Sequence, residues 1–158
     1  MRMIVLCLIV ASLSAPPVLA QTPPVDGVRV TTDSGSRILT GVQLDSLVQD
    51  TVSASYHERP ATIYVGVGLD RLLARAGVIV AGARGRDFQQ VVVVEAADGY
   101  RMVFGLGEID PSITGRRVIL ARTQSSEDGP WRLVVSGDRR GARWVRQVRS
   151  IRLLRLPT

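Results

Sequence analysis

The chain has 158 residues, of which 46% are hydrophobic and 22% are charged. This composition is typical of a folded globular protein, so disorder is not the default expectation. All the basic residues are arginine, and the formal net charge is +6. A basic chain suggests nucleic acid as a partner. We expect none here, because the few aromatic residues are not interleaved with the arginines as a stacking surface requires.

The first 20 residues are predicted to be a secretory signal peptide. Arg2 supplies one positive charge, residues 3–13 form an apolar run, and Val18-Leu19-Ala20 places small or apolar groups at the cleavage position. A membrane anchor is the alternative, but a spanning helix needs about 20 apolar residues and this run is shorter. We therefore expect cleavage after Ala20, a periplasmic or secreted protein, and no transmembrane segment after cleavage.

The only cysteine, Cys7, lies inside this predicted signal peptide. The mature chain would contain no cysteine, which excludes a disulfide, a thiolate nucleophile and a cysteine metal site. Residues 21–27 include two prolines and are predicted to form a flexible leader. Residues 28–158 are long enough for one domain with its own core.

The first half of this domain alternates between strands and short helices. Alternating apolar residues predict strands at residues 28–32, 37–39, 51–56 and 61–65. Thr40 can cap a short helix, whose apolar side would carry Val42, Leu44, Leu47 and Val48. A second helix is predicted over residues 69–76, with Leu69, Leu72 and Leu73 on one face and Gly77 at its end.

The second half is predicted to consist mainly of strands. The apolar run within residues 90–96 indicates a central strand, and Asp98-Gly99 indicates a hairpin to residues 100–104. A helical turn at residues 106–109 is closed by Pro111, and further strands follow at residues 117–122, 131–135 and 148–156. We predict an α+β fold with a mixed, mostly antiparallel sheet and short helices at its margins. Leu72, Leu133 and Val92 or Val94 should be buried together.

Four segments of the chain resemble the molybdopterin-binding domain of the sulfite oxidase family. Residues 63–78 are similar to the strand, Gly-Val turn and leucine-rich helix of that family, and residues 97–100 to its Asp-Gly-Tyr hairpin. Residues 131–138 resemble its Leu-Val-Val strand, and residues 141–148 resemble its Gly-Ala-Arg-x-Val-Lys segment. The four occur in the family's order and spacing, so the resemblance implies a sulfite oxidase-like α+β fold.

In that family the Gly-Ala-Arg segment binds the phosphate and ring of molybdopterin. The resemblance therefore implies a cofactor-binding or anion-binding site at His57, Arg139, Arg140, Gly141, Arg143 and Arg146. Guanidinium groups on a glycine-containing loop are suited to phosphate oxygens. The structural alternative is that these arginines stack on Trp144 and pair with Asp138 or Glu127.

Two departures from the family argue against an active enzyme. The region that matches the family's molybdenum-ligating cysteine, residues 52–57, contains no thiol, and His57 is the only histidine of the chain. A cofactor acquired in the cytoplasm also needs a twin-arginine signal, whereas this signal has one arginine. We expect no catalytic residue, no metal and no bound cofactor, although molybdopterin remains possible by resemblance.

The expected function is that of a catalytically degenerate, exported family member. It would bind a small anionic ligand, or act as an accessory module for a periplasmic protein partner. Two alternatives stay open: a molybdopterin-dependent oxidoreductase with an altered metal ligand, and an interaction subunit of a periplasmic redox complex.

Overall fold

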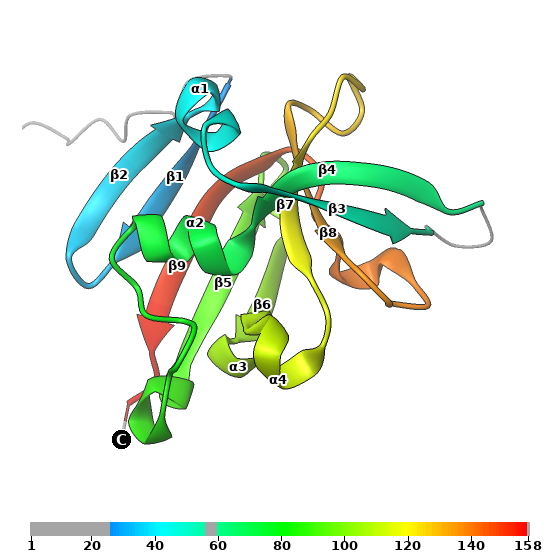
Figure 1. The fold of residues 1–158 in the computed structure, drawn as a ribbon. Coiled ribbons are helices and arrows are strands. Elements are labelled where there is room, and N and C mark those ends of the chain that lie inside the picture. Colours follow the sequence, from blue (N-terminus) through cyan, green and yellow to red (C-terminus); the bar gives the residue numbers. More distant parts are fainter. Residues whose placement is uncertain (1–25, 56–59, 158) are drawn as a thin grey trace, which may run out of the picture.

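The computed structural model describes residues 26–55 and 60–157. Within them the chain folds into a five-stranded sheet, a four-stranded sheet and a few short helices (Figure 1). The predicted α+β class with mostly antiparallel pairing is therefore confirmed. The predicted single sheet is wrong, because the strands divide into two. The predicted signal peptide and His57 lie outside the described residues.

The five-stranded sheet contains both termini of the described domain. Its strands are, in spatial order, β2 (Gly35–Thr40), β1 (Gly27–Thr32), β9 (Val148–Arg155), β5 (Gln90–Ala96) and β6 (Arg101–Gly105). Only β1 and β9 pair in parallel, and the other neighbours are antiparallel. The last strand of the chain thus lies in the middle of the sheet rather than at its edge.

The four-stranded sheet is antiparallel throughout. Its order is β3 (Gln49–Ala54), β4 (Thr62–Gly68), β7 (Val118–Arg122) and β8 (Trp131–Val135). Beyond β8, Val145 forms an isolated antiparallel bridge to Leu133. This bridge fixes the segment between η2 (Gly141–Arg143) and β9 against the middle of β8.

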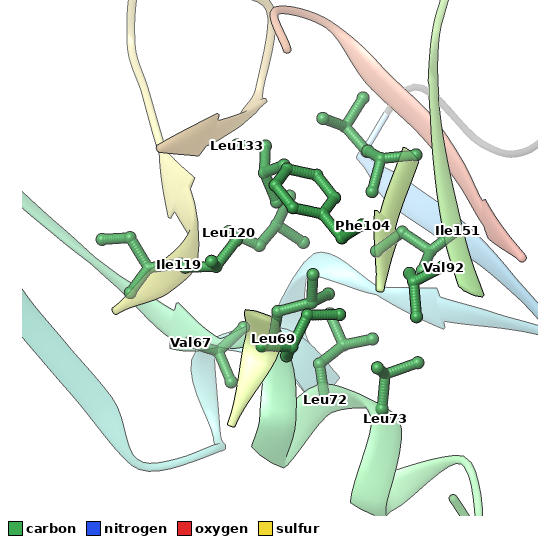
Figure 2. Packing of buried hydrophobic residues seen from close by; sticks show 14 of the residues in the cluster. Val67, Leu69, Leu72, Leu73, Val92, Phe104, Ile119, Leu120, Leu133 and Ile151 are labelled. Carbon is green, nitrogen blue, oxygen red and sulfur yellow. The ribbon is translucent and has the colours of Figure 1, made fainter. Parts of the chain in front are cut away.

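One hydrophobic core joins the two sheets through α2 (Leu69–Arg75). Figure 2 shows leucines of α2 facing side chains from both sheets, including Phe104, Ile151, Leu120 and Leu133. Leu72, Leu133, Val92 and Val94 are all fully buried, so the predicted core is confirmed. Leu69, Leu72 and Leu73 of α2 are fully buried in this core.

The prediction for the first helix is wrong. α1 spans only Gly41–Asp45, because the capping box of Thr40 and Gln43 starts a helix that stops after one turn. Val42 and Val48 are therefore exposed, at 79% and 70%, instead of lying on a buried face. The helical turn predicted at residues 106–109 is present as α3 (Leu106–Ile109), and Pro111, which follows it, occupies the first turn of α4 (Pro111–Thr114).

The Gly66-Val67-Gly68 segment is the end of β4 and not a turn after it. At Gly66 the neighbouring strand β7 approaches so closely that an added Cβ would lie 2.3 Å from the carbonyl oxygen of Leu120. A glycine is therefore required for β4 to pair with β7 and to deliver α2 into the core. In the described part of the chain, no helix has the length and apolar character needed to span a membrane.

Candidate functional site

The clearest charged site lies where β8 ends, and its centre is Asp138. The guanidinium of Arg143 donates to both carboxylate oxygens of Asp138, from Nε at 2.9 Å and from Nη2 at 2.6 Å. The remaining Arg143 nitrogen, Nη1, donates to Glu108 of α3 at 2.9 Å. Arg116 approaches the same Asp138 carboxylate at 3.5 Å. We call Arg116, Asp138, Arg143 and Glu108 the Asp138 cluster.

Burial makes the interaction of Arg143 with Asp138 the strongest of the cluster. The Asp138 side chain is only 10% exposed, and the Arg143 side chain is 30% exposed. Hydrogen bonding to Asp138 raises the pKa of Arg143, against the opposing effect of partial burial. The guanidinium also stands over the ring of Phe104, 5.7 Å from its centroid. Arg143 is therefore held in one position by two acids and an aromatic ring.

A small cavity of about 190 Å³ adjoins this cluster. Glu108, Arg116 and Arg143 line it together with Thr114 and the apolar side chains of Val118 and Val135. Two guanidinium groups at one cavity can hold an oxyanion, since they present several N–H donors in fixed directions. The two carboxylates oppose such binding and neutralise part of the charge.

Arg139 and Arg140 add positive charge beside the cluster. Both side chains are exposed, in the turn between β8 and η2, and neither has an ion-pair partner among the described residues. Gly141, the first residue of η2, is buried, and its carbonyl accepts a hydrogen bond from the Trp144 backbone at 3.0 Å. The site predicted from the sequence thus contributes three arginines and a turn to this end of β8.

Arg146 does not join them. Its guanidinium pairs with Glu127, in the loop that precedes β8. Because Val145 pairs antiparallel with Leu133, residues before Val145 extend toward the end of β8 and residues after it toward the beginning. Arg143 and Arg146 therefore lie toward opposite ends of β8, each against its own acid. The structural alternative named Asp138 or Glu127 as partners of these arginines, and Arg143 pairs with Asp138 while Arg146 pairs with Glu127.

The stacking predicted on Trp144 also occurs, but a different arginine provides it. The guanidinium of Arg132 on β8 lies over Trp144, 5.1 Å from the ring centroid. Its Nη1 forms an ion pair with the Asp128 carboxylate at 2.8 Å. Tyr64 meets Trp144 edge to face at 5.5 Å. With its side chain 9% exposed, Arg132 is a structural element of the second sheet.

Glu108 and Arg116 were missed by the sequence reasoning. They lie far from Asp138 along the chain and belong to no motif, so no local signal identifies them. Only the close approach of α3 and of the segment before β7 to the turn at Asp138 brings them in. The tertiary structure, and not the local sequence, therefore brings Glu108 to Arg143 and Arg116 to Asp138.

The residues present do not fit a pterin phosphate held jointly by Arg143 and Arg146. In this structure Arg143 is paired with Asp138 and Arg146 with Glu127, toward opposite ends of β8. A phosphate that contacted both guanidinium groups would have to break at least one of these ion pairs. Among the described residues, no three His, Cys, Asp or Glu side chains converge as metal ligands. Compared with known proteins, the sequence matches no family model and no characterised protein closely enough to establish a relationship.

Proposed function

We propose that this protein is an exported, non-catalytic binding module that takes a small oxyanion at the Asp138 cluster. The proposal includes a fold of the sulfite oxidase molybdopterin-binding type, from the four sequence segments that resemble that family. The observation that carries it is that Arg116 and Arg143, which both line one cavity, converge on the carboxylate of Asp138. Arg139 and Arg140 directly follow Asp138 in the chain and have no ion-pair partner among the described residues, so positive charge exceeds negative charge around the cluster.

The absence of a cysteine from the proposed mature chain supports binding in preference to catalysis. The family resemblance assigns the molybdenum ligand to a cysteine, and only Cys7 in the proposed signal peptide could supply one. An anion site needs no such group, because guanidinium donors and partial burial are sufficient. A protein of this kind would capture a phosphate- or sulfate-like ligand, or present it to a periplasmic partner.

The experiment is thermal unfolding of the mature protein with and without sulfate or phosphate. A ligand that binds only the folded state raises the melting temperature by mass action. Arg139→Gln combined with Arg140→Gln should remove most of that rise without unfolding the protein, because both side chains are exposed and unpaired in the described structure. Arg37→Gln combined with Arg155→Gln is the matched control, since it removes the same charge from exposed positions on other strands.

The outcomes separate the candidate functions. A melting rise that the control variant loses equally would indicate nonspecific charge effects and contradict the proposal. Near-stoichiometric molybdenum in protein isolated from its native compartment would favour the oxidoreductase with an altered ligand. No effect of either anion, with loss of a protein partner in the double variant, would favour the interaction subunit.

Export is tested separately by the intact mass of the protein recovered from the periplasm or medium. We expect a chain that begins at Gln21, because cleavage after Ala20 follows from the proposed signal. Retention of residues 1–20 in a membrane fraction would contradict export by this route.

A further inference from the structure

A second and larger cavity lies at the opposite end of β8, away from the Asp138 cluster. It measures about 400 Å³ and opens between the loop of residues 123–130 and the start of β9. Its size falls within the range of about 300–1,000 Å³ that is usual for small-molecule sites. Its polar lining comes from Thr123, Gln124, Ser125, Ser126, Gln147 and Arg149.

The backbone of this wall is irregular at two nearby positions, and both line the cavity. Gln147 has φ +50°, the only positive value among the described residues other than glycine. Its backbone N–H donates to the backbone carbonyl of Asp128 at 2.7 Å, and its own carbonyl accepts from the Ala97 backbone N–H at 3.0 Å. Residues held in this sparsely populated conformation concentrate at ligand sites, where the surroundings keep them in place.

The second irregularity is a β-bulge at Arg149. Glu95 pairs with Ser150 and Ala96 pairs with Val148, so Arg149 has no partner residue on β5. A bulge redirects the side chain of the extra residue, and bulges are frequent beside active and binding sites. The bulge therefore explains why Arg149, a residue of β9, lines the cavity.

Arg149 differs from the neighbouring arginines because it forms no ion pair with an acidic side chain in the described part of the chain. Arg146 is paired with Glu127, and Arg152 approaches Glu95 at 3.6 Å. Within residues 26–55 and 60–157, no carboxylate forms an ion pair with Arg149, although its side chain is half-buried. A partly desolvated guanidinium without a counter-charge is suited to a carboxylate, which it can bind through two parallel hydrogen bonds.

The rest of the polar lining carries hydroxyl and amide groups rather than further charge, and Pro130 and Val148 add an apolar surface. The Thr123 hydroxyl donates to the Gly129 carbonyl at 2.6 Å, and the Gln147 amide donates to the Glu127 carbonyl at 3.0 Å. These bonds fix the loop and leave acceptor and donor capacity on both side chains. Ser126 has no hydrogen bond among the described residues. Such groups match the hydroxyls of a ligand, which both donate and accept.

We propose that this cavity binds a small hydroxylated carboxylate, such as a sugar acid, with its carboxylate on Arg149. The hydroxyls of the ligand face Thr123, Ser125 and Ser126. This site is independent of the one at Asp138, because it lies at the other end of β8 and shares no lining residue with it.

The test is calorimetric titration of the mature protein with galacturonate and gluconate, and with glucose and acetate as comparison ligands. We expect the sugar acids to bind and the two comparison ligands to bind at least about tenfold more weakly, because each lacks half of the recognised groups. Arg149→Gln should weaken sugar-acid binding at least about tenfold, since it removes the charged donor. Arg155→Gln, on the same strand, is the matched control and should bind as the parent does.

Several results would overturn the proposal. They are no binding of either sugar acid, equal binding of glucose or acetate, and unchanged affinity of the Arg149→Gln variant. If that variant does not fold, as judged by its circular dichroism, Ser126→Ala replaces it. That variant should weaken galacturonate binding while leaving the melting rise with sulfate unchanged, and an unaltered galacturonate affinity would contradict the assignment. The response to sulfate of the Arg139→Gln, Arg140→Gln double variant tests only the proposed anion site at the Asp138 cluster and has no bearing on the cavity at Arg149.

Discussion

Asp138 holds Arg143 through two hydrogen bonds, of 2.9 Å and 2.6 Å, and is shared with Arg116 at 3.5 Å. One carboxylate thus orients two guanidinium groups at the wall of the smaller cavity. The same carboxylate limits how strongly those groups can attract an external anion. Stability and anion binding should therefore respond in opposite directions when Asp138 loses its charge.

Asp138→Asn is expected to lower the free energy of unfolding by about 1–3 kcal/mol, the range for hydrogen bonds to charged groups. It should also increase the melting rise produced by sulfate, because less negative charge opposes the ligand. Denaturant titration and thermal unfolding measure the two effects. Asp33→Asn, an exposed acid on the β1–β2 turn, is the control and should change neither. A smaller sulfate response in Asp138→Asn would show that the anion does not bind at this cluster.

Sulfate binding should not vary between about pH 6 and about pH 9, where arginine is fully charged. The pKa of Arg143 is raised by its hydrogen bonds to Asp138. A raised pKa in a cation means that its contribution is complete below the unfolded value, and is lost only as pH rises through the folded value. The folded and the unfolded pKa of Arg143 both lie far above neutral pH. Affinity that falls through about pH 6.5 would instead implicate His57, the only histidine.

Leu72→Ala should lower the free energy of unfolding by about 2–5 kcal/mol, because it leaves a cavity in the hydrophobic core. Leu72 is fully buried in the core that Figure 2 shows. Val42→Ala is the matched control: Val42 is 79% exposed, so its truncation should cost less than about 0.5 kcal/mol. Urea titration of the two variants gives the comparison, and equal midpoints would contradict the packing of α2.

Gly66→Ala should destabilise the protein by about 3 kcal/mol or more, because the new methyl group would meet backbone atoms of β7 that cannot move aside. The nearest contact would be 2.3 Å, to the carbonyl of Leu120. Gly105→Ala is the control, since an added Cβ there would lie 3.6 Å from the nearest atom, on Glu108. If the melting temperatures of the two variants are equally close to that of the parent, β4 and β7 do not approach as described.

The order and type of most elements were predictable because their signals are local. The leucines of residues 69–76 recur with helical spacing, and Gly77 ends the helix with a φ of +88°. Alternation of apolar residues located the strands to within a few residues. The same spacing misled at Val42 and Val48, where an apolar pattern continues beyond a helix of one turn.

The sequence alone determined the strand and helix pattern, the burial of Leu72 and Leu133, and the acids available to Arg143 and Arg146. Only the tertiary structure decided that the strands form two sheets, with β9 between β1 and β5. It also decided that Glu108 and Arg116 join Asp138, and that a bulge directs Arg149 to a cavity of its own. The physical reason is that periodicity and turn chemistry act over a few neighbouring residues. Strand partners and charge clusters depend instead on which distant surfaces are buried against one another.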